Sequence, residues 1–369
     1  MKSRGAAPDL TTSYEQDLRL VPNAWSAAGL ILMLVAWVFG PVFLSDFWTV
    51  VFGYAGVAAV GAIGLNLLTG FTGQVSLGHA FFLGIGAYVA AQVGMTWSWP
   101  LYLWLPAAAL VGAAVGGLVG PFALRLRGQY LVVVTLGLIF LGEHLFKEWK
   151  SVTGGGSGTA VSPELSLDPL DFSGMELFGT DYSRQQMMFW FIWAIVGVGV
   201  LGAKNIVRTR PGRAMQAVRD RDLAAEVIGV SLSRYKIGAF ALSSAYAAVA
   251  GGLYGSLQGF VSPTEWNLFL SIQYVAMIII GGLGTIFGAV LGAIVLTALP
   301  RLISELSKNA DLPGVSGDLG GPDGFISIFS LQQMLFGALI VAFLLIEPRG
   351  LAALWLRFKA YLKTWPFTY

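Results

Sequence analysis

A polar cluster interrupts an apolar part of this sequence between Gly64 and Tyr88. Amides, hydroxyls and one imidazole could hydrogen bond a polar solute, and glycines allow a helix to break and expose backbone donors and carbonyls. Such backbone is tolerated only where protein or a water-filled cavity surrounds it. The alternative is a short turn before a tightly packed helix, with a buried, satisfied histidine. The candidate contacts are Asn66, Thr69, Thr72, Gln74, Ser76 and His79, with Gly73 and Gly78 as candidate hinges.

A second candidate for solute contact lies between Ser271 and Thr285. Gln273 is a neutral polar residue early in an apolar stretch, and the later run Gly281, Gly282, Leu283, Gly284 predicts a hinge or a tight turn. A lone glutamine in a membrane span also commonly hydrogen bonds a neighbouring helix. Both readings of Gln273 stay open at this stage.

A basic segment, 208–236, contains seven of the 22 Lys and Arg residues. Its sequence predicts one short helix from Arg213 to Ile228, ended by Gly229 in the left-handed conformation. Small residues on this helix would allow the close approach of a partner, and charges would surround them, so the segment is a candidate docking element. The alternative is a basic loop that only fixes the topology of the chain. The coupling residues are Arg213, Arg219, Asp220, Asp222, Ala224, Ala225, Glu226 and Gly229.

Several kinds of chemistry have no sequence signature here. The chain lacks a G-x-x-x-x-G-K-[ST] phosphate loop, so ATP would have to be used by another subunit. Paired intramembrane carboxylates, common in proton-driven carriers, are also missing. With no cysteine there is no disulfide or thiolate metal site. We therefore expect no catalytic residue, no metal site, no bound cofactor and no nucleic-acid partner.

The elements that hold these residues are predicted to be transmembrane helices. The chain is 56% hydrophobic and 11% charged, whereas soluble domains carry about 25% charged residues. Apolar stretches of about 20 residues span a bilayer. This composition predicts an all-α integral membrane protein in the lipid bilayer, whose first span is a retained anchor. The ten expected spans cover 24–44, 50–69, 76–96, 101–124, 129–146, 187–206, 236–259, 267–282, 285–303 and 330–346.

Basic residues orient this map. With the N-terminus inside, 17 of the 22 Lys and Arg residues lie on the cytoplasmic side, as the positive-inside rule requires. The expected division is a cytoplasmic segment 1–23, a permease-like membrane domain 24–346 and a cytoplasmic tail 347–369. Loops 151–184 and 304–330 would lie outside the membrane and segment 208–236 inside it.

A weak internal repeat relates the fourth and ninth spans. Val111–Arg125 and Phe287–Arg301 share five of fifteen positions. An offset of five helices reverses the direction of the chain across the membrane, so the match predicts a five-helix inverted repeat.

The run GLNLLTGFTGQVSLGHAFFLGIGAY, with RGQYLVVVTLG, TGGGSG, PGRAMQAVRDRDLAAEVIGVSLSRYKIGAFALSSAYAAVAGGLYG and LSIQYVAMIIIGGLGTIFGAVLGA, resembles the branched-chain amino acid ABC transporter permeases of the LivM type. The resemblance covers roughly residues 50–300. It implies a type II ABC importer fold in a bacterial inner membrane. It also implies a second related permease, two ABC ATPase subunits that bind ATP, and a periplasmic substrate-binding protein.

The resemblance further implies that Ala224, Ala225, Glu226 and Gly229 belong to the loop that docks on the ATPase. Relatives often carry Glu where this chain has Gln273, which removes a charge from a candidate pathway. Import of branched-chain or related amino acids, delivered by the periplasmic binding protein, is therefore the expected function. A urea or short-amide permease, an ion-coupled secondary transporter and a channel remain alternatives.

Overall fold

The computed structural model describes residues 24–124, 129–163, 166–167, 170–171, 175–177, 180–309, 315–316, 326–346 and 350–364. The predicted N-terminal segment 1–23 and much of the two predicted external loops, including Glu164, Asp168, Asp311, Asp318 and Asp323, lie outside the described residues.

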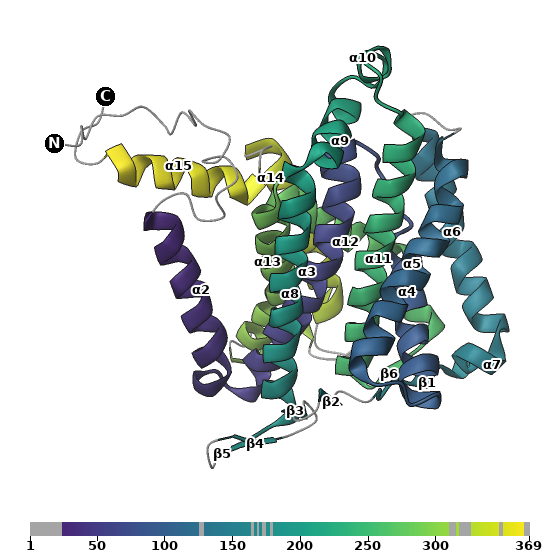
Figure 1. Ribbon diagram of the computed structural model, residues 1–369. Helices are drawn as coiled ribbons and strands as arrows, with labels where there is room; N and C mark the ends of the chain where they lie inside the picture. The colour runs from purple at the N-terminus through teal and green to yellow at the C-terminus, as the bar shows by residue number, and fades with distance from the viewer. Residues whose placement is uncertain are drawn as a thin grey trace.

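Long apolar helices dominate the described chain (Figure 1). They are α2 (Ala24–Phe43), α3 (Asp46–Thr72), α4 (His79–Val89), α5 (Leu101–Leu124), α6 (Gln129–Glu148), α8 (Arg184–Arg208), α11 (Leu232–Gln258), α12 (Leu268–Gly281), α13 (Ile286–Asn309) and α14 (Ile328–Ile346). A π-helix, η1 (Ala90–Thr96), continues α4. The shorter helices are α7 (Lys150–Thr153), η2 (Gly155–Ser157), α9 (Arg210–Asp220), α10 (Asp222–Val227), η3 (Pro263–Glu265) and α15 (Gly350–Thr364).

The strands are short and form two-stranded ladders in the connections. Strand β1 (Thr159–Ala160) pairs antiparallel with β6 (Phe260–Val261), with Thr159 opposite Val261. Two antiparallel pairs follow, β2 (Ser166–Leu167) with β3 (Leu170–Asp171) and β4 (Met175–Leu177) with β5 (Thr180–Tyr182). Strands β7 (Val315–Ser316) and β8 (Ile326–Ser327) pair in parallel.

Within the described residues, five helices are long and apolar enough to cross a bilayer: α3, α8 and α11, together with 101–122 of α5 and 130–148 of α6. Further apolar helical segments of 10–17 residues cover 31–43, 268–281, 286–302 and 333–343. A helix satisfies its own backbone hydrogen bonds, which is what the bilayer core demands. The predicted class is confirmed: the chain is an all-α, multi-pass membrane protein.

Helices α3 and α11 pack on each other at the centre of the bundle, with α4 and α5 against α11 and α13 against α3. Small residues permit this close packing. A Cβ atom at Gly86 would collide with the Ala248 carbonyl, and one at Gly251 with the Leu83 carbonyl. Helices α4 and α11 therefore touch through their backbones, as small residues allow in membrane helix pairs.

The prediction of a single helix from Arg213 to Ile228 is wrong. Helix α9 ends at Asp220, Arg221 is extended with φ −156°, and α10 starts at Asp222. The Asp222 carboxylate accepts a hydrogen bond from the Leu223 amide at 2.8 Å, and a carboxylate is favourable at a helix N-terminus. A second helix therefore starts where a continuous one was expected. Gly229 does adopt the expected left-handed conformation, with φ 88°.

Figure 1 shows α10 beyond one end of the bundle and strands β2–β5 at the opposite end. The predicted C-terminal tail contains α15, which lies across the direction of the long helices and packs on α12 and α13. Gly350 opens α15 with φ 72°, and a Cβ atom there would lie 2.6 Å from the Gly282 amide nitrogen. The start of α15 therefore packs directly on the end of α12.

Candidate functional site

Three separate segments meet where α3 ends, at a group of residues that we call the junction: Asn66, Gly70, Arg219, Gly284 and Thr285. The buried Asn66 amide donates to the Thr285 carbonyl at 2.8 Å and accepts from the Gly284 amide at 2.9 Å. Arg219 of α9 donates through Nη1 to the Gly70 carbonyl at 3.0 Å. The junction thus connects the basic segment to α3 and to the turn between α12 and α13.

Glycines make the junction possible. A Cβ atom at Gly70 would lie 2.5 Å from the Gly284 backbone nitrogen, so only glycine allows this approach. Gly73 ends α3 in the left-handed conformation with φ 71°. The Gln74 amide then donates back to the Leu68 carbonyl at 3.3 Å and so supplies a partner to a carbonyl in the last turns of the helix. Two of the predicted hinge glycines, Gly73 and Gly284, are therefore at turns that pack on Arg219.

The other predicted polar residues of this segment are buried in protein. Gln74 donates to the Lys236 carbonyl at 3.4 Å, and Ser76 accepts from the Gly78 amide at 3.2 Å. His79 begins α4 with its ring 4.9 Å from that of Tyr274, and among the described residues its Nε2 makes no hydrogen bond of standard geometry. In the described residues each of these side chains therefore contacts other protein groups.

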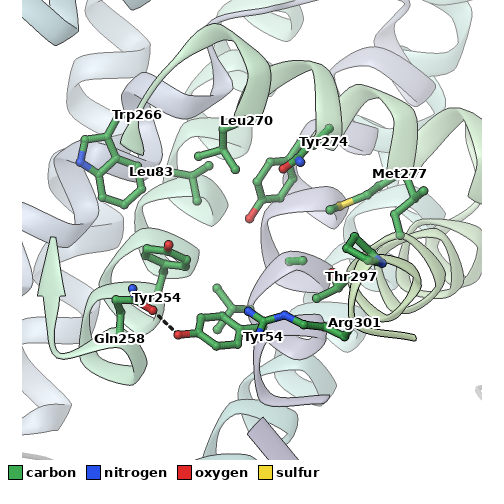
Figure 2. Close-up of a pocket in the computed structure, with 15 residues that line it drawn as sticks. Tyr54, Leu83, Tyr254, Gln258, Trp266, Leu270, Tyr274, Met277, Thr297 and Arg301 are labelled. Carbon is green, nitrogen blue, oxygen red and sulfur yellow. Dashed lines mark hydrogen bonds between the residues drawn. The ribbon is translucent and has the colours of Figure 1, made fainter. Parts of the chain in front are cut away.

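A cavity of about 570 Å³ lies between α3, α11, α12 and α13 (Figure 2). Of the predicted pathway residues, Gln273 lines it, whereas Asn66, Gln74, Ser76 and His79 do not. Aliphatic side chains, among them Leu83, Met277 and Leu296, form part of the wall. Small-molecule sites commonly have volumes of about 300–1,000 Å³ and mostly apolar walls with a few polar groups.

The polar groups of the cavity surround Tyr54. Its hydroxyl donates to the Gln258 side chain, and the Arg301 guanidinium lies over its ring, 5.7 Å from the centroid. Tyr254 lies 5.8 Å from Tyr54 between ring centroids, inclined at 57°. Trp266 packs edge-on against Tyr254 at 5.6 Å. The cavity therefore offers one cation and several aromatic faces.

A carboxyl group lies just outside this wall, on Glu265 in the loop between α11 and α12. The Ser262 amide donates to its Oε1 at 3.4 Å in a capping box. Its Oε2 is buried and makes no hydrogen bond of standard geometry. Burial raises the pKa of Glu265, although contacts with the Ser262 backbone and the Tyr254 hydroxyl lower it.

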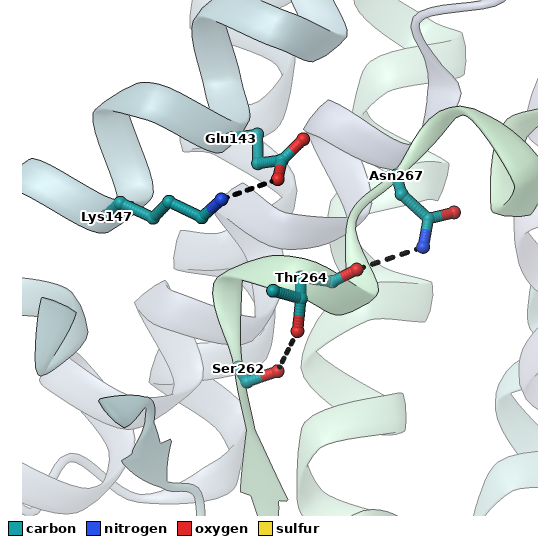
Figure 3. A network of polar contacts seen from close by, with 5 residues as sticks. All are labelled: Glu143, Lys147, Ser262, Thr264 and Asn267. Atoms are coloured by element: carbon teal, nitrogen blue, oxygen red, sulfur yellow. Dashed lines mark hydrogen bonds and ion pairs between the residues drawn. The ribbon is translucent and has the colours of Figure 1, made fainter. Parts of the chain in front are cut away.

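Local hydrogen bonds hold this loop (Figure 3). The hydroxyls of Ser262 and Thr264 lie 2.8 Å apart, and the Asn267 amide donates to the Thr264 carbonyl at 2.9 Å. The neighbouring Lys147–Glu143 pair, at 2.7 Å, is half-exposed on α6. The position of Glu265 is thus fixed by the loop that carries it.

Apolar side chains are exposed on α10. Leu223, Val227 and Ile228 are 64%, 87% and 75% exposed. The expected small face of Ala224 and Ala225 is not a single surface, because Ala224 is exposed and Ala225 is buried. Neighbouring residues on a helix point about 100° apart, so one faces inward and the other outward. The remaining predicted charges, on Arg213, Asp220, Asp222 and Glu226, lie on exposed or half-exposed positions.

Sequence reasoning missed Tyr54, Tyr254, Glu265 and Arg301. Their spacing carries no motif, since they come from three helices and a loop that are distant in the chain. In the sequence, Arg301 stands out only as the last position of the weak internal repeat. Its place after Pro300 at the end of an apolar stretch was the one available signal.

A cavity between the helices of a multi-pass membrane protein is the kind of site at which membrane transport proteins hold a solute. A family model described as "Branched-chain amino acid transport system / permease component" matches residues 48–344. This chain belongs to that family of permeases.

Two curated relatives are similar over most of the chain. The high-affinity branched-chain amino acid transport system permease protein LivM of Salmonella typhimurium is 30% identical over 78% of this chain and 66% of its own length. LivM of Escherichia coli is 29% identical over 87% of this chain and 73% of its own length. The chain therefore spans about two thirds or somewhat more of these relatives. LivH of Salmonella typhimurium is 26% identical over 66% of this chain. No solved structure matches the chain.

Proposed function

We propose that this chain is the permease subunit of an ATP-driven importer that carries branched-chain or related amino acids across a bacterial inner membrane. The observation that carries the proposal is the family match over residues 48–344, together with the LivM relatives. Family membership weighs against an ion-coupled carrier. A urea or short-amide permease of the same family is the alternative.

The proposed complex contains a second related permease, two ATPase subunits and a periplasmic binding protein. The absence of a phosphate loop from the sequence supports ATP binding by the ATPase subunits alone. The similarity to both LivM and LivH, which are named as permease proteins of one kind of transport system, favours a permease heterodimer.

In the proposed topology both termini and the segment 208–236 are cytoplasmic, and the loop 151–184 is periplasmic. The 17 of 22 Lys and Arg residues on the inner side support this orientation. The separation of α10 from β2–β5 at opposite ends of the bundle agrees with it. Ten spans, with a domain 24–346 between a cytoplasmic N-terminal segment and a cytoplasmic tail 347–369, complete the proposal.

We also propose a five-helix inverted repeat of the type II importer kind. Under it, α3, α4 and α5 would correspond to α11, α12 and α13. Helix α3 packs on α13, and α11 packs on α5. A two-fold relation between the halves produces such a reciprocal pairing, because each contact must have a symmetry mate.

Coupling to ATP would take place at α10. The exposed Leu223, Val227 and Ile228 are the proposed contact with a cleft on an ATPase subunit, and the surrounding charges would fix its orientation. Movement of α10 and α9 would reach α3 and the α12–α13 turn through Arg219 and the junction. This mechanical role is assigned to Arg213, Arg219, Asp220, Asp222, Ala224, Ala225, Glu226 and Gly229, with Leu223, Val227 and Ile228 added.

The proposed substrate route includes the cavity and Gln273. In this route, four predicted pathway residues would pack behind the residues that line the cavity: Asn66, Gln74, Ser76 and His79. Five glycines would allow the helix ends to move: Gly73, Gly78, Gly281, Gly282 and Gly284. The binding protein would supply affinity, so weak and exchangeable contacts suffice in the permease.

Purification of the complex from native membranes tests this function. We expect a second permease and two ATPases to co-purify, and the binding protein of the system to select L-leucine, L-isoleucine or L-valine in a ligand screen. Recovery of the chain alone, or selection of urea by the binding protein, would contradict the proposal.

A further inference from the structure

The cavity has a positively charged group at one place and lies near a carboxyl group at another. Arg301 is the charged residue among those that line it. A guanidinium is the side chain best matched to a carboxylate, because its donors can bind both oxygens at once. Arg301 lies over the Tyr54 ring, so the ring limits where the guanidinium can lie. This side of the cavity is suited to an anion.

Electron-rich rings form another part of the wall, and a carboxyl group lies just outside it. Glu265 contacts the hydroxyl of Tyr254, which is itself part of the wall. Among the described residues its buried Oε2 makes no hydrogen bond of standard geometry, which leaves acceptor capacity for a further donor. The Trp266 Nε1, next to Tyr254, is also buried and has the Tyr88 hydroxyl as its polar neighbour. Tyrosine and tryptophan faces attract cations.

Aliphatic side chains complete the cavity. Val57, Leu83, Met277 and Leu296 contribute to the wall and would contact a branched hydrocarbon without a polar cost. Gln258 and Gln273 add neutral hydrogen-bonding groups. A neutral solute would need neither the cation nor the carboxyl group, whereas a zwitterion with an aliphatic side chain would use both.

We propose that this cavity is a transit site for zwitterionic α-amino acids, with the carboxylate at Arg301 and the ammonium group at the Tyr54–Tyr254 rings beside Glu265. The proposal rests on the proposed import function, since it names the chemical groups by which the permease recognises its substrate. It makes Arg301 and Glu265 specificity-determining residues and disfavours urea and short amides.

Binding of four matched probes to the purified full-length chain tests it: L-leucine, leucinamide, 4-methylpentanoate and 4-methylpentanamide. These share the isobutyl group and differ in which charges they carry. By saturation-transfer NMR titration we expect L-leucine to bind most tightly and the neutral amide least. Arg301→Gln should weaken L-leucine binding about tenfold, as for loss of a charged hydrogen bond, and leave leucinamide unchanged. Arg301→Lys should recover part of the loss.

Glu265→Gln is the reciprocal variant. Glutamine can occupy the same position of the capping box, so the loop is retained while the charge is removed. We expect it to weaken L-leucine and leucinamide and to leave 4-methylpentanoate unchanged. Three results would overturn the proposal. They are equal binding of all four probes, no binding of L-leucine to a folded chain, and identical losses of affinity for every probe in both variants.

Failure of the import function would look different. In that case the pattern of probe binding would hold, while ATP-driven uptake of L-leucine by the assembled transporter would be absent. Conversely, normal uptake combined with an unchanged probe pattern in Arg301→Gln would refute this site and leave the import function standing.

Discussion

Gly70→Ala should disrupt the junction and separate ATP hydrolysis from transport. The added methyl group would lie 2.5 Å from the Gly284 backbone nitrogen and would collide with the Asn66 side chain. The asparagine can rotate away, but the backbone of the α12–α13 turn has to move. Both Asn66 hydrogen bonds, to Thr285 and from Gly284, depend on that turn.

The expected loss of stability follows from these contacts. Overpacking costs about 1–3 kcal/mol, and each hydrogen bond lost contributes about 0.5–1.5 kcal/mol. Replacement of a helical glycine by alanine returns about 0.5–1 kcal/mol. The free energy of unfolding should therefore fall by roughly 1–5 kcal/mol. Gly137→Ala is the matched control, because no atom of the described chain lies within 4 Å of a Cβ at this exposed helical position.

The assay has two parts. Denaturant unfolding of the purified chain measures stability, and uptake per ATP hydrolysed by the assembled transporter measures coupling. We expect Gly70→Ala to be less stable and to transport less per ATP, whereas Gly137→Ala should transport normally and gain about 0.5–1 kcal/mol of stability. Arg219→Ala, which removes the bond to the Gly70 carbonyl, should lower coupling with a smaller loss of stability because Arg219 is partly exposed. If Gly70→Ala matches the Gly137→Ala control in both measurements, the proposed role of the junction in stability and coupling is refuted.

Three further predictions address the surfaces. Val227→Asp should weaken association with the ATPase about tenfold or more, since burial of a valine contributes about 1.5–3 kcal/mol. The control variant Ser233→Asp should leave this association unchanged. Equal association of the two variants in a pull-down would contradict docking at α10. Burial raises the pKa of Glu265 from its ordinary value of 4.5, so folding favours the protonated carboxyl group and the stabilisation is lost as pH rises. The unfolding temperature of Glu265→Gln relative to the unaltered chain should therefore increase from pH 4 to pH 7, and a constant difference would exclude this linkage. A cysteine at the exposed Ser157 should react with an impermeant thiol reagent in intact cells, and one at Ser231 should not. The labelling reports only the introduced residue, because the chain has no cysteine of its own. The reverse labelling pattern would show that the proposed membrane orientation is wrong.

Helix positions were predictable because long apolar stretches have few alternatives in a bilayer. The span expected at 50–69 lies within α3, and the one expected at 236–259 nearly coincides with α11. Local polar interactions were harder to predict from the sequence. The break at Arg221 depends on an extended backbone and on the Asp222 carboxylate, which compete with a continuous helix by small energies. The burial of Ala225 follows from that break.

The cavity could not be predicted because it depends on tertiary packing. Tyr54, Tyr254 and Arg301 belong to α3, α11 and α13, and no sequence period relates them. Gln273 was identified because a polar residue within an apolar span is conspicuous. Asn66 was also conspicuous, but its partners are the Gly284 and Thr285 backbone groups, which residue types do not reveal.

The most direct test of the import function is uptake of radiolabelled L-leucine into proteoliposomes that contain the co-purified permeases and ATPases. The binding protein is added outside and ATP is enclosed inside. We predict uptake that requires both the binding protein and hydrolysable ATP and that is not stimulated by a sodium or proton gradient. Uptake by this chain without ATPases, driven by an ion gradient, would contradict the assignment as an ATP-driven importer permease.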